Sequence, residues 1–345
     1  MKTYRLALIG FGTVGQGFSQ ILRDFGAQYE KDFGACFRIT AVSDLQKGSL
    51  YDPQGLDPAL LLRTVETTGS LESISAPHKG WDALKTIRES NADVVAELSF
   101  TDLKTGEPAI SHFKAAIQTG KHVITTNKGP VALAYQELNS LACQHGVTIG
   151  VEGSVMSGTP SLRMGTEMLS AADITCIQGI VNGTTNYILS QMDAGAAYAD
   201  ALAEAQARGY AEADPTGDVE GFDAAGKVVI LANLLMGTRL RMADVDRQGI
   251  TGLTVEDIRQ AKQKNERWKL IGRVEKTSAG VKASVKPHRL PESHPLAQVG
   301  GATNAITFTT TLLGDVTLIG PGAGRLATGY ALVEDLLALH RISGE

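Results

Sequence analysis

The feature that most constrains the fold is a glycine-rich transition from strand to helix at the start of the chain. Residues 3–9, TYRLALI, form a short apolar run of strand-forming residues, and GFGTVG follows at 10–15 before helical spacing begins. In a G-x-G-x-x-G turn the glycines allow a tight bend, close approach of a pyrophosphate and helix–strand packing. The alternative is a tight turn without a ligand. We expect dinucleotide binding here, by the following residues: Gly10, Gly12, Thr13, Val14 and Gly15.

Strand-like and helix-like segments alternate over the first part of the chain. Residues 38–44, 92–99 and 122–127 are apolar and rich in strand formers, and segments with helical spacing separate them. This alternation predicts an α/β fold, a Rossmann-type doubly wound parallel sheet. After residue 150 the chain alternates between turn-rich and strand-like stretches, which predicts a second, α+β domain. The last stretch is a glycine turn followed by an amphipathic helix.

Composition excludes several classes of partner. The chain has 345 residues, is 43% hydrophobic and carries a formal charge of −5, so it lacks the basic field that nucleic acids or anionic membranes require. The first residues contain too short an apolar run for a signal peptide, so we expect none, and no apolar run of about 18 residues occurs. Three widely spaced cysteines argue against disulfides and zinc, and no histidines have metal-ligand spacing. We expect a cytoplasmic protein with no nucleic-acid or membrane partner.

An acid at the end of the second expected strand bears on cofactor choice. Asp44 stands where a carboxylate accepts hydrogen bonds from a ribose 2′-hydroxyl, which favours NAD. It lies farther from the glycines than the usual distance of roughly 20 residues, and Lys47 nearby suits a 2′-phosphate instead. NAD and NADP both remain open at this point.

A lysine at the head of an apolar segment is the strongest catalytic candidate. Lys227 precedes VVILANLL, and Asp223 lies four residues earlier, on the same face of a helix. A solvent-exposed ion pair is the alternative. The apolar residues around the helix indicate burial instead, and a buried lysine is usually paired with an acid or has a functional role. A second lysine, Lys128, follows a strand that ends at Asn127, where doubly wound sheets bind ligands. The loop at 214–218 and the polar turn at 182–188 could contribute acids and backbone donors.

Taken together, these motifs resemble those of one family, the homoserine dehydrogenases. The resemblance runs nearly end to end, through GFGTVG, TTNKGPVA, EGSVMSGTPS, GIVNGTTNYIL, ARGYAEADPTGDVEGFDAAGKVVILAN and GPGAGRLATGYALVEDL. It implies NAD(P)-dependent interconversion of L-homoserine and L-aspartate 4-semialdehyde, on the branch towards threonine and methionine. It also implies that the C-terminal helix returns to the nucleotide domain. The expected domains are therefore 1–149 with 321–345, for the dinucleotide, and 150–320, for substrate binding, catalysis and dimerisation.

The resemblance also implies roles for individual residues. Lys227 matches the proton donor and acceptor at the substrate oxygen, and Lys128 matches a lysine that polarises this oxygen near the nicotinamide. The residues implied to contact the substrate are Glu212, Asp218, Asp223 and Gly183. Those implied to contact the cofactor, besides the first glycine turn, are Ser99, Lys128 and Gly322, and Asp44 joins them by its position after the second strand. Main-chain carbonyls that match a sodium site in some members belong to Glu152, Val155, Ser157 and Thr159.

The resemblance also bears on the oligomeric state, and individual residues bear on alternative activities. The family suggests a homodimer formed through residues 151–161 and the strands around 283–320. The chain ends at Glu345, directly after the expected helix, so we expect no fused threonine-sensing domain and no inhibition by threonine through one. An aspartate-semialdehyde dehydrogenase would need a nucleophilic cysteine, and Cys143 and His145 do not face each other on a helix. A non-catalytic dinucleotide sensor would have no need of Lys227.

Overall fold

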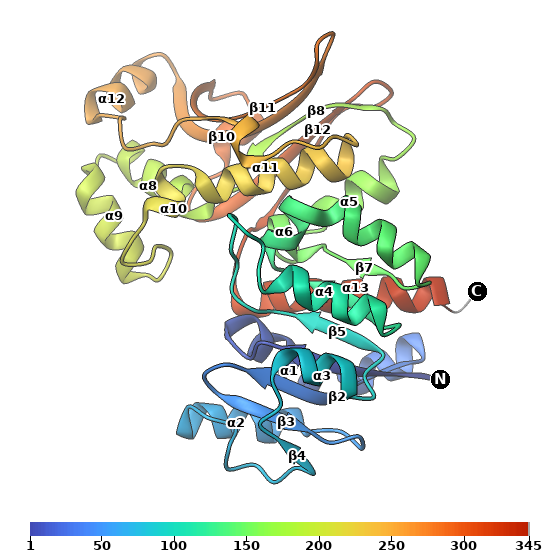
Figure 1. The fold of residues 1–345 in the computed structure, drawn as a ribbon. Helices are drawn as coiled ribbons and strands as arrows, with labels where there is room; N and C mark the ends of the chain where they lie inside the picture. Colours follow the sequence, from blue (N-terminus) through green and yellow to red (C-terminus); the bar gives the residue numbers. More distant parts are fainter. Residues whose placement is uncertain (344–345) are drawn as a thin grey trace. The chain divides into compact units, whose positions relative to one another are not determined.

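The chain folds into two compact units, described in a computed structural model that covers residues 1–343 (Figure 1). The N-terminal unit comprises residues 1–158 together with the segment that begins at Gly324, and the second unit comprises Thr159–Ala323. Within residues 1–343, none of the helices combines the length and apolar character needed to cross a membrane. The functional division of the chain at residues 149/150 and 320/321 stays a prediction.

A seven-stranded sheet forms the centre of the N-terminal unit, in the order β4-β3-β2-β1-β5-β6-β7. Its strands are β1 (Lys2–Ile9), β2 (Ala35–Asp44), β3 (Gly48–Tyr51), β4 (His78–Lys79), β5 (Val94–Glu97), β6 (His122–Thr125) and β7 (Ile149–Gly150). The pairings from β2 through β1, β5 and β6 to β7 are parallel, whereas β3 and β4 pair antiparallel at one edge. The carboxyl ends of the parallel strands therefore meet at one edge of the sheet, where doubly wound folds bind ligands.

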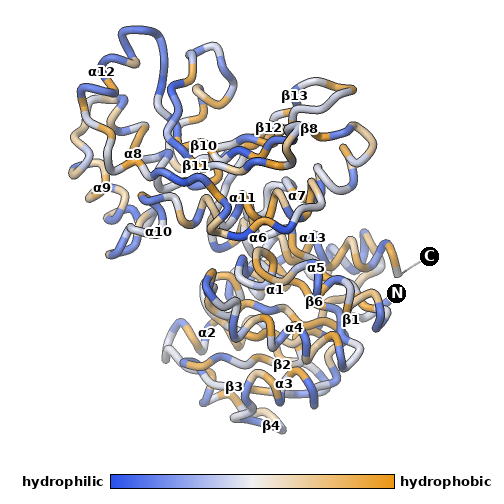
Figure 2. Tube along the Cα trace, turned by 45° about the horizontal axis from the view of Figure 1, so that its top comes forward, coloured by the Kyte–Doolittle hydropathy of each residue, from blue (hydrophilic) through white to orange (hydrophobic). Residues whose placement is uncertain are grey.

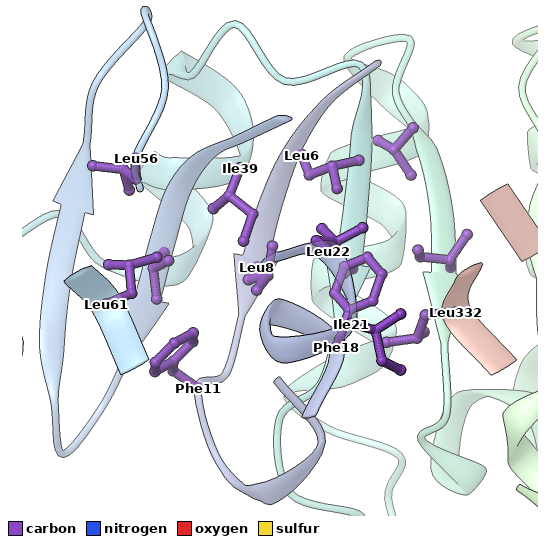
Figure 3. Close-up of a cluster of buried hydrophobic side chains, with 14 of the residues drawn as sticks. Leu6, Leu8, Phe11, Phe18, Ile21, Leu22, Ile39, Leu56, Leu61 and Leu332 are labelled. Carbon is purple, nitrogen blue, oxygen red and sulfur yellow. The ribbon is translucent and has the colours of Figure 1, made fainter. Parts of the chain in front are cut away.

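Helices pack around this sheet. They are α1 (Thr13–Phe33), α2 (Pro58–Thr68), α3 (Ala83–Glu89), α4 (Ala109–Gln118), α5 (Lys128–Gln144), α6 (Gly153–Met156) and α13 (Arg325–Ser343). Leu6 and Leu8 share a face of β1 because side chains alternate along a strand, and they pack in one core with Phe18 of α1 and Leu332 of α13 (Figure 3). A Cβ atom at Gly17 would lie 2.1 Å from the Arg325 carbonyl oxygen, so only glycine allows α13 to begin this close to α1.

The second unit is built on a six-stranded sheet in the order β13-β12-β8-β10-β11-β9. Its strands are β8 (Ile174–Ile180), β9 (Asp246–Arg247), β10 (Glu266–Thr277), β11 (Gly280–Pro291), β12 (Thr303–Thr310) and β13 (Gly314–Pro321). All pairings are antiparallel except that of β9 with β11. The strand β13 forms one edge of this sheet.

One helix of the second unit is buried on nearly every side. The helical segments of this unit are α7 (Ser161–Arg163), η1 (Met164–Met168), α8 (Gly183–Asp193), α9 (Tyr198–Ala207), α10 (Thr216–Val219), α11 (Phe222–Leu235), η2 (Met242–Asp244), α12 (Val255–Gln263) and η3 (Pro295–Gln298). Every residue from 224 to 232 of α11 is buried, and the helix packs against β10 and β11. Figure 2 shows α11 mostly in the hydrophobic colour. Its apolar sequence is explained by this burial.

The expected fold class is confirmed: a Rossmann-like parallel sheet in one part of the chain and a mixed sheet with helices in the other. The sequence analysis did not identify β3 and β4. These strands are only four and two residues long, and β4 is exposed, so neither produces a pattern of alternating apolar residues.

Candidate active site

The glycine turn of the N-terminal unit has the shape that a dinucleotide requires. Gly10 has φ +106°, and a Cβ atom there would lie 2.4 Å from the Leu98 carbonyl oxygen. A Cβ atom at Gly15 would lie 2.7 Å from the Gly10 carbonyl oxygen, whereas the corresponding position at Gly12 faces open space. Helix α1 begins at Thr13, and Gly12 supplies no side-chain cap for its first N–H groups. Gly12 therefore gives an anion open access to uncapped backbone donors at a helix N-terminus.

Asp44 is tied to the same turn. One carboxylate oxygen accepts from the Phe11 N–H at 2.7 Å, and the other accepts from the N–H groups of Gln46 and Lys47 at 3.0 and 2.9 Å. Burial acts to raise the pKa of Asp44, but these backbone hydrogen bonds and the Lys47 charge outweigh it and lower the pKa. The Lys47 ammonium lies 3.9 Å from the carboxylate. A charged carboxylate thus stands at the end of β2, beside the glycine turn.

A buried carboxylate organises the ends of β5 and β6. Glu97 is 0% exposed and accepts four hydrogen bonds, from the N–H and hydroxyl of Ser99, from His112 Nδ1 at 3.1 Å and from Asn127 Nδ2 at 3.1 Å. The Asn127 amide also donates to the carbonyls of Ser99 and Phe100. Glu97 therefore fixes Ser99 and Asn127 together, and sequence analysis identified neither Glu97 nor His112 as part of a site.

Lys128 is positioned by this arrangement. It is the first residue of α5, and Asn127 caps that helix by accepting from the Gly129 N–H at 3.0 Å. The Asn127 N–H in turn donates to the Thr125 hydroxyl at 2.9 Å, and this hydroxyl donates to the Glu97 carbonyl at 2.7 Å. The structure thus places Ser99 and Lys128 at neighbouring strand ends, on the edge that also carries the glycine turn.

In the second unit, Lys227 is held in a cluster of polar groups. The residue is 7% exposed, its ammonium donates to the Val181 carbonyl at 2.6 Å, and it pairs with the Asp223 carboxylate at 3.0 Å. Lys227 and Asp223 thus share a face of α11, as their spacing predicts, and they form an ion pair in which the lysine is buried rather than solvent-exposed. The cation lies at the junction of α11 with the chain that leaves β8.

Asn182, which sequence analysis did not single out, links the two aspartates. Its Nδ2 donates to Asp218 at 2.6 Å and to Asp223 at 3.1 Å, while its Oδ1 accepts from Thr185. Burial raises the pKa of Asp218, and the nearby Asp223 charge adds to this effect. Two acids and a lysine thus share one cluster around the N-terminus of α8. The side chains involved come from positions 36 and 41 residues apart, so no local pattern reveals the contact.

Glu212 is placed differently from the other acids. Its side chain is exposed, and within residues 1–343 it makes no hydrogen bond or ion pair with Asp218, Asp223 or Lys227. Its main-chain carbonyl accepts from Gln206 at 3.0 Å. Its role in substrate binding stays a prediction.

Two glycines with predicted ligand contacts face the same side chain in the second unit. A Cβ atom at Gly183 would lie 2.6 Å from the Ala302 carbonyl oxygen and 3.4 Å from Asn304 Oδ1. A Cβ atom at Gly322 would lie 2.0 Å from Asn304 Nδ2. Neither position has room for a larger residue.

The predicted sodium segment begins with a short helix in the N-terminal unit. Glu152 and Val155 are buried in and beside α6, and Ser157 at its end has φ 54°. The Ser157 hydroxyl lies 2.8 Å from the Thr328 hydroxyl. Thr159, the first residue of the second unit, donates its hydroxyl hydrogen to the Pro321 carbonyl at 3.0 Å. Over the part of the chain that the structure describes, histidine, cysteine and acidic side chains form no group of three or more suited to a metal.

Comparison with known proteins gives consistent matches. A family model described as homoserine dehydrogenase matches residues 160–337. A protein of Pseudomonas canavaninivorans named NAD(+)-dependent homoserine dehydrogenase is 45% identical over 344 residues, which cover 99% of this chain and 97% of that protein. The structure of a homoserine dehydrogenase from Thiobacillus denitrificans matches with a TM-score of 0.86 at 34% identity, covering 100% of this chain and 74% of that chain. A hyperthermophilic archaeal homoserine dehydrogenase mutant in complex with NADPH matches with a TM-score of 0.84 at 30% identity, over 97% of both chains.

Proposed function

The chain belongs to the homoserine dehydrogenase family, and on that premise we propose that it interconverts L-homoserine and L-aspartate 4-semialdehyde with a nicotinamide cofactor. The observation that carries this proposal is the buried Lys227 ammonium beside Asp218 and Asp223. The test is to mix the purified protein with L-homoserine and NAD⁺ or NADP⁺ and to follow formation of the reduced nicotinamide. Cofactor binding without reduction would support a non-catalytic sensor instead.

Lys227 serves as the general acid and base. A lysine ammonium has three N–H donors, and the Val181 carbonyl and the Asp223 carboxylate occupy two of them. Among residues 1–343 no third acceptor contacts this ammonium, so the third donor is available for the substrate oxygen. In aldehyde reduction Lys227 donates a proton to the carbonyl oxygen, and in the reverse direction its neutral amine accepts the proton of the alcohol. The Asp223 carboxylate, 3.0 Å away, fixes the position of the Lys227 side-chain nitrogen.

The acids hold the amino group of the substrate. Asp218 and Asp223 carry negative charge next to the reactive lysine, and we assign Asp218 and Glu212 to the substrate ammonium. A bound cation favours the ionised form of Asp218 and so opposes the effect of burial on its pKa. Gly183, at the start of α8, brings backbone donors to the same place.

The residues of the N-terminal unit fit a dinucleotide. Gly10, Gly12, Thr13, Val14 and Gly15 would hold the pyrophosphate, because the Gly12 position is open and the helix donors are uncapped. When bound, NAD(P)(H) supplies or accepts the hydride. Ser99 and Lys128 stand at neighbouring strand ends, with Ser99 lining the nicotinamide site and the Lys128 cation polarising the substrate oxygen.

NAD is the preferred cofactor in this proposal. Asp44 is a charged carboxylate at the end of β2, which accepts from a ribose hydroxyl and repels a 2′-phosphate. The relative from P. canavaninivorans is named as NAD(+)-dependent, which agrees with this choice. The ratio of kcat/KM for NAD⁺ to that for NADP⁺ measures the preference directly.

The main-chain carbonyls of residues 152, 155, 157 and 159 are proposed to bind a sodium ion. Hard cations accept backbone oxygen ligands. The sharp turn at Ser157, with its positive φ, reorients consecutive carbonyls in this segment. Replacing sodium by choline in the buffer should lower the melting temperature reversibly. A melting temperature that is the same in both salts would remove the ion from the proposal.

The protein is proposed to act as a cytoplasmic homodimer. Among the described residues, β13 pairs only with β12, so its outer edge presents unpaired backbone groups. Leu312, Leu313 and Ile319 on or beside this strand are exposed. A second copy of the chain would cover both features. Light scattering at several concentrations, on the intact protein and on an Ile319→Lys variant, tests this association.

A further inference from the structure

A strap of chain in the second unit crosses the turn between the two aspartates of the candidate site. The turn, residues 219–222, joins α10 to α11, and Asp218 precedes it while Asp223 follows it. The strap consists of residues 246–251 and begins with β9, which pairs with β11 at the edge of the sheet. The strap is therefore fixed to the sheet on one side and faces the turn on the other.

The strap holds the first half of the turn by direct contacts. The Ile250 N–H donates to the Val219 carbonyl at 2.8 Å, and the Thr251 hydroxyl donates to the Glu220 carboxylate at 2.7 Å. A Cβ atom at Gly249 would lie 2.6 Å from the Glu220 Cα atom, so the strap approaches the turn as closely as a glycine allows.

Arg247 of the strap holds the second half of the turn. Its guanidinium donates through Nη1 to the Glu220 carbonyl, and its Cζ atom lies 3.6 Å from the centroid of the Phe222 ring. A planar guanidinium can stack on a ring and donate at its edge at the same time. Gly221, between these two contacts, has φ +78°. One half-buried side chain thus fixes a turn that a glycine would otherwise leave free to change conformation.

The two helices that the turn joins depend on it to different degrees. Helix α11 is fixed by its own burial, because every residue from 224 to 232 is buried. Of the four residues of α10, Val219 is buried and Asp218 is half-buried, whereas the first two are exposed. A short helix with so little buried surface depends on the contacts of the turn for its position. Loss of these contacts should therefore displace Asp218 more than Asp223.

We propose that Arg247 positions Asp218 for the ammonium group of the substrate. Arg247 fixes the turn, the turn fixes α10, and α10 holds the Asp218 carboxylate 2.6 Å from Asn182 Nδ2, the group that also donates to Asp223. Arg247 is thus a positioning residue, which acts through the turn and not by contact with the substrate. This role rests on the proposed function, which assigns Asp218 to the substrate ammonium.

Two variants of Arg247 and one control test this role. Arg247→Met removes the guanidinium and keeps an aliphatic side chain, whereas Arg247→Lys keeps a cation that can donate to the Glu220 carbonyl. The matched control is Arg289→Met, because Arg289 of β11 also lies over an aromatic ring, that of Trp268 at 5.7 Å, and pairs with Glu266. For each protein, kcat, the KM for L-homoserine and the KM for NAD⁺ are measured, together with unfolding in urea.

The expected result is a change in one kinetic constant. Arg247→Met should raise the KM for L-homoserine about tenfold, because a displaced Asp218 loses about one charge-assisted hydrogen bond to the ammonium. The value of kcat and the KM for NAD⁺ should stay within about twofold, since the lost contact binds the ground state and the transition state alike. Arg247→Lys should recover most of the loss. Removing a positive charge would by itself strengthen the binding of an ammonium, so a higher KM identifies positioning and not charge.

A purely structural role for Arg247 gives a different result. In that case Arg247→Met would unfold at lower urea concentration while the KM for L-homoserine stayed unchanged, which would overturn the proposal. An equal rise of this KM in Arg289→Met would overturn it as well. If Arg247→Met does not fold, Phe222→Leu at an exposed position removes the ring under the guanidinium and should raise the same KM about threefold.

Failure of the proposed function is recognised separately. A wild type that forms no reduced cofactor with L-homoserine would overturn the proposed function, and the role of Arg247 with it. Turnover in the wild type, combined with an unchanged KM for L-homoserine in the folded variants, would leave the proposed function intact and overturn the role of Arg247 alone.

Discussion

Two buried charged groups, Glu97 in the N-terminal unit and Lys227 in the second unit, are held in contrasting ways. The Glu97 carboxylate accepts four hydrogen bonds, about as many as its lone pairs allow. Within the described part of the chain, the Lys227 ammonium uses two of its three donors. Three of the hydrogen bonds to Glu97 reach Oε1 and one reaches Oε2, and each donor belongs to the protein, which suits a group that positions its neighbours. Lys227 keeps one donor for a ligand, which suits a group that takes part in chemistry.

The largest expected effect is the loss of kcat when Lys227 is replaced. Lys227→Ala should lower kcat by about two to four orders of magnitude, the usual contribution of a general acid or base. The affinity for the cofactor should barely change. Steady-state kinetics and cofactor titration measure the two quantities. Turnover close to that of the wild type would remove Lys227 from the mechanism.

A third buried group, Lys269 of the second unit, is expected to affect stability rather than catalysis. Burial and the nearby Arg267 charge lower the pKa of Lys269 from 10.5 to about 8. The folded state thus disfavours the charged form, so its contribution to stability is complete above pH 10.5 and is lost as the pH falls through 8. The free energy of unfolding of the wild type, relative to Lys269→Met, should rise by about 3 kcal/mol between pH 8 and 10.5.

Urea unfolding at several pH values measures this difference for Lys269. Lys269→Met serves as the control for the wild type, because all other titrating groups are common to both proteins and cancel in the difference. A difference that does not vary with pH would show that Lys269 titrates normally in the folded state.

A smaller effect, on the free energy of unfolding, is expected when the Glu97 carboxylate loses a hydrogen bond. His112→Leu leaves Glu97 with three donors and should lower the free energy of unfolding by about 1–3 kcal/mol, while kcat falls less than in Lys227→Ala. His112→Gln retains an N–H donor and should lose less stability. Urea unfolding of the two variants, with kcat for each, decides the matter. Equal stability of His112→Leu and the wild type would contradict the positioning role of this pair.

The smallest effect concerns the cofactor. Asp44→Ser removes the charge at the end of β2 and should raise the ratio of kcat/KM for NADP⁺ to that for NAD⁺ about tenfold, the equivalent of roughly one charge-assisted hydrogen bond. Gln46→Ala, which keeps the N–H that Asp44 accepts from, is the control. A ratio that stays constant in Asp44→Ser would show that Asp44 only shapes the turn.

Local patterns account for what could be predicted. The glycine turn, the alternation of strands and helices, and Lys227 four residues after Asp223 are all features of short segments, so the sequence displays them directly. The exposed side chain of Glu212 shows the limit of such patterns. An acid close in sequence to Asp218 can still point to solvent, because the loop that carries it determines its direction.

By itself, then, the sequence determined the fold class, the family and the lysine at the head of α11, because each depends on the order and spacing of nearby residues. Only the tertiary structure decided that Asn182 bridges two aspartates, that His112 donates to Glu97, and that Asn304 lies unpaired between two glycines. These contacts join distant segments. They depend on strand register and on the direction of each side chain, and packing of the whole unit sets both.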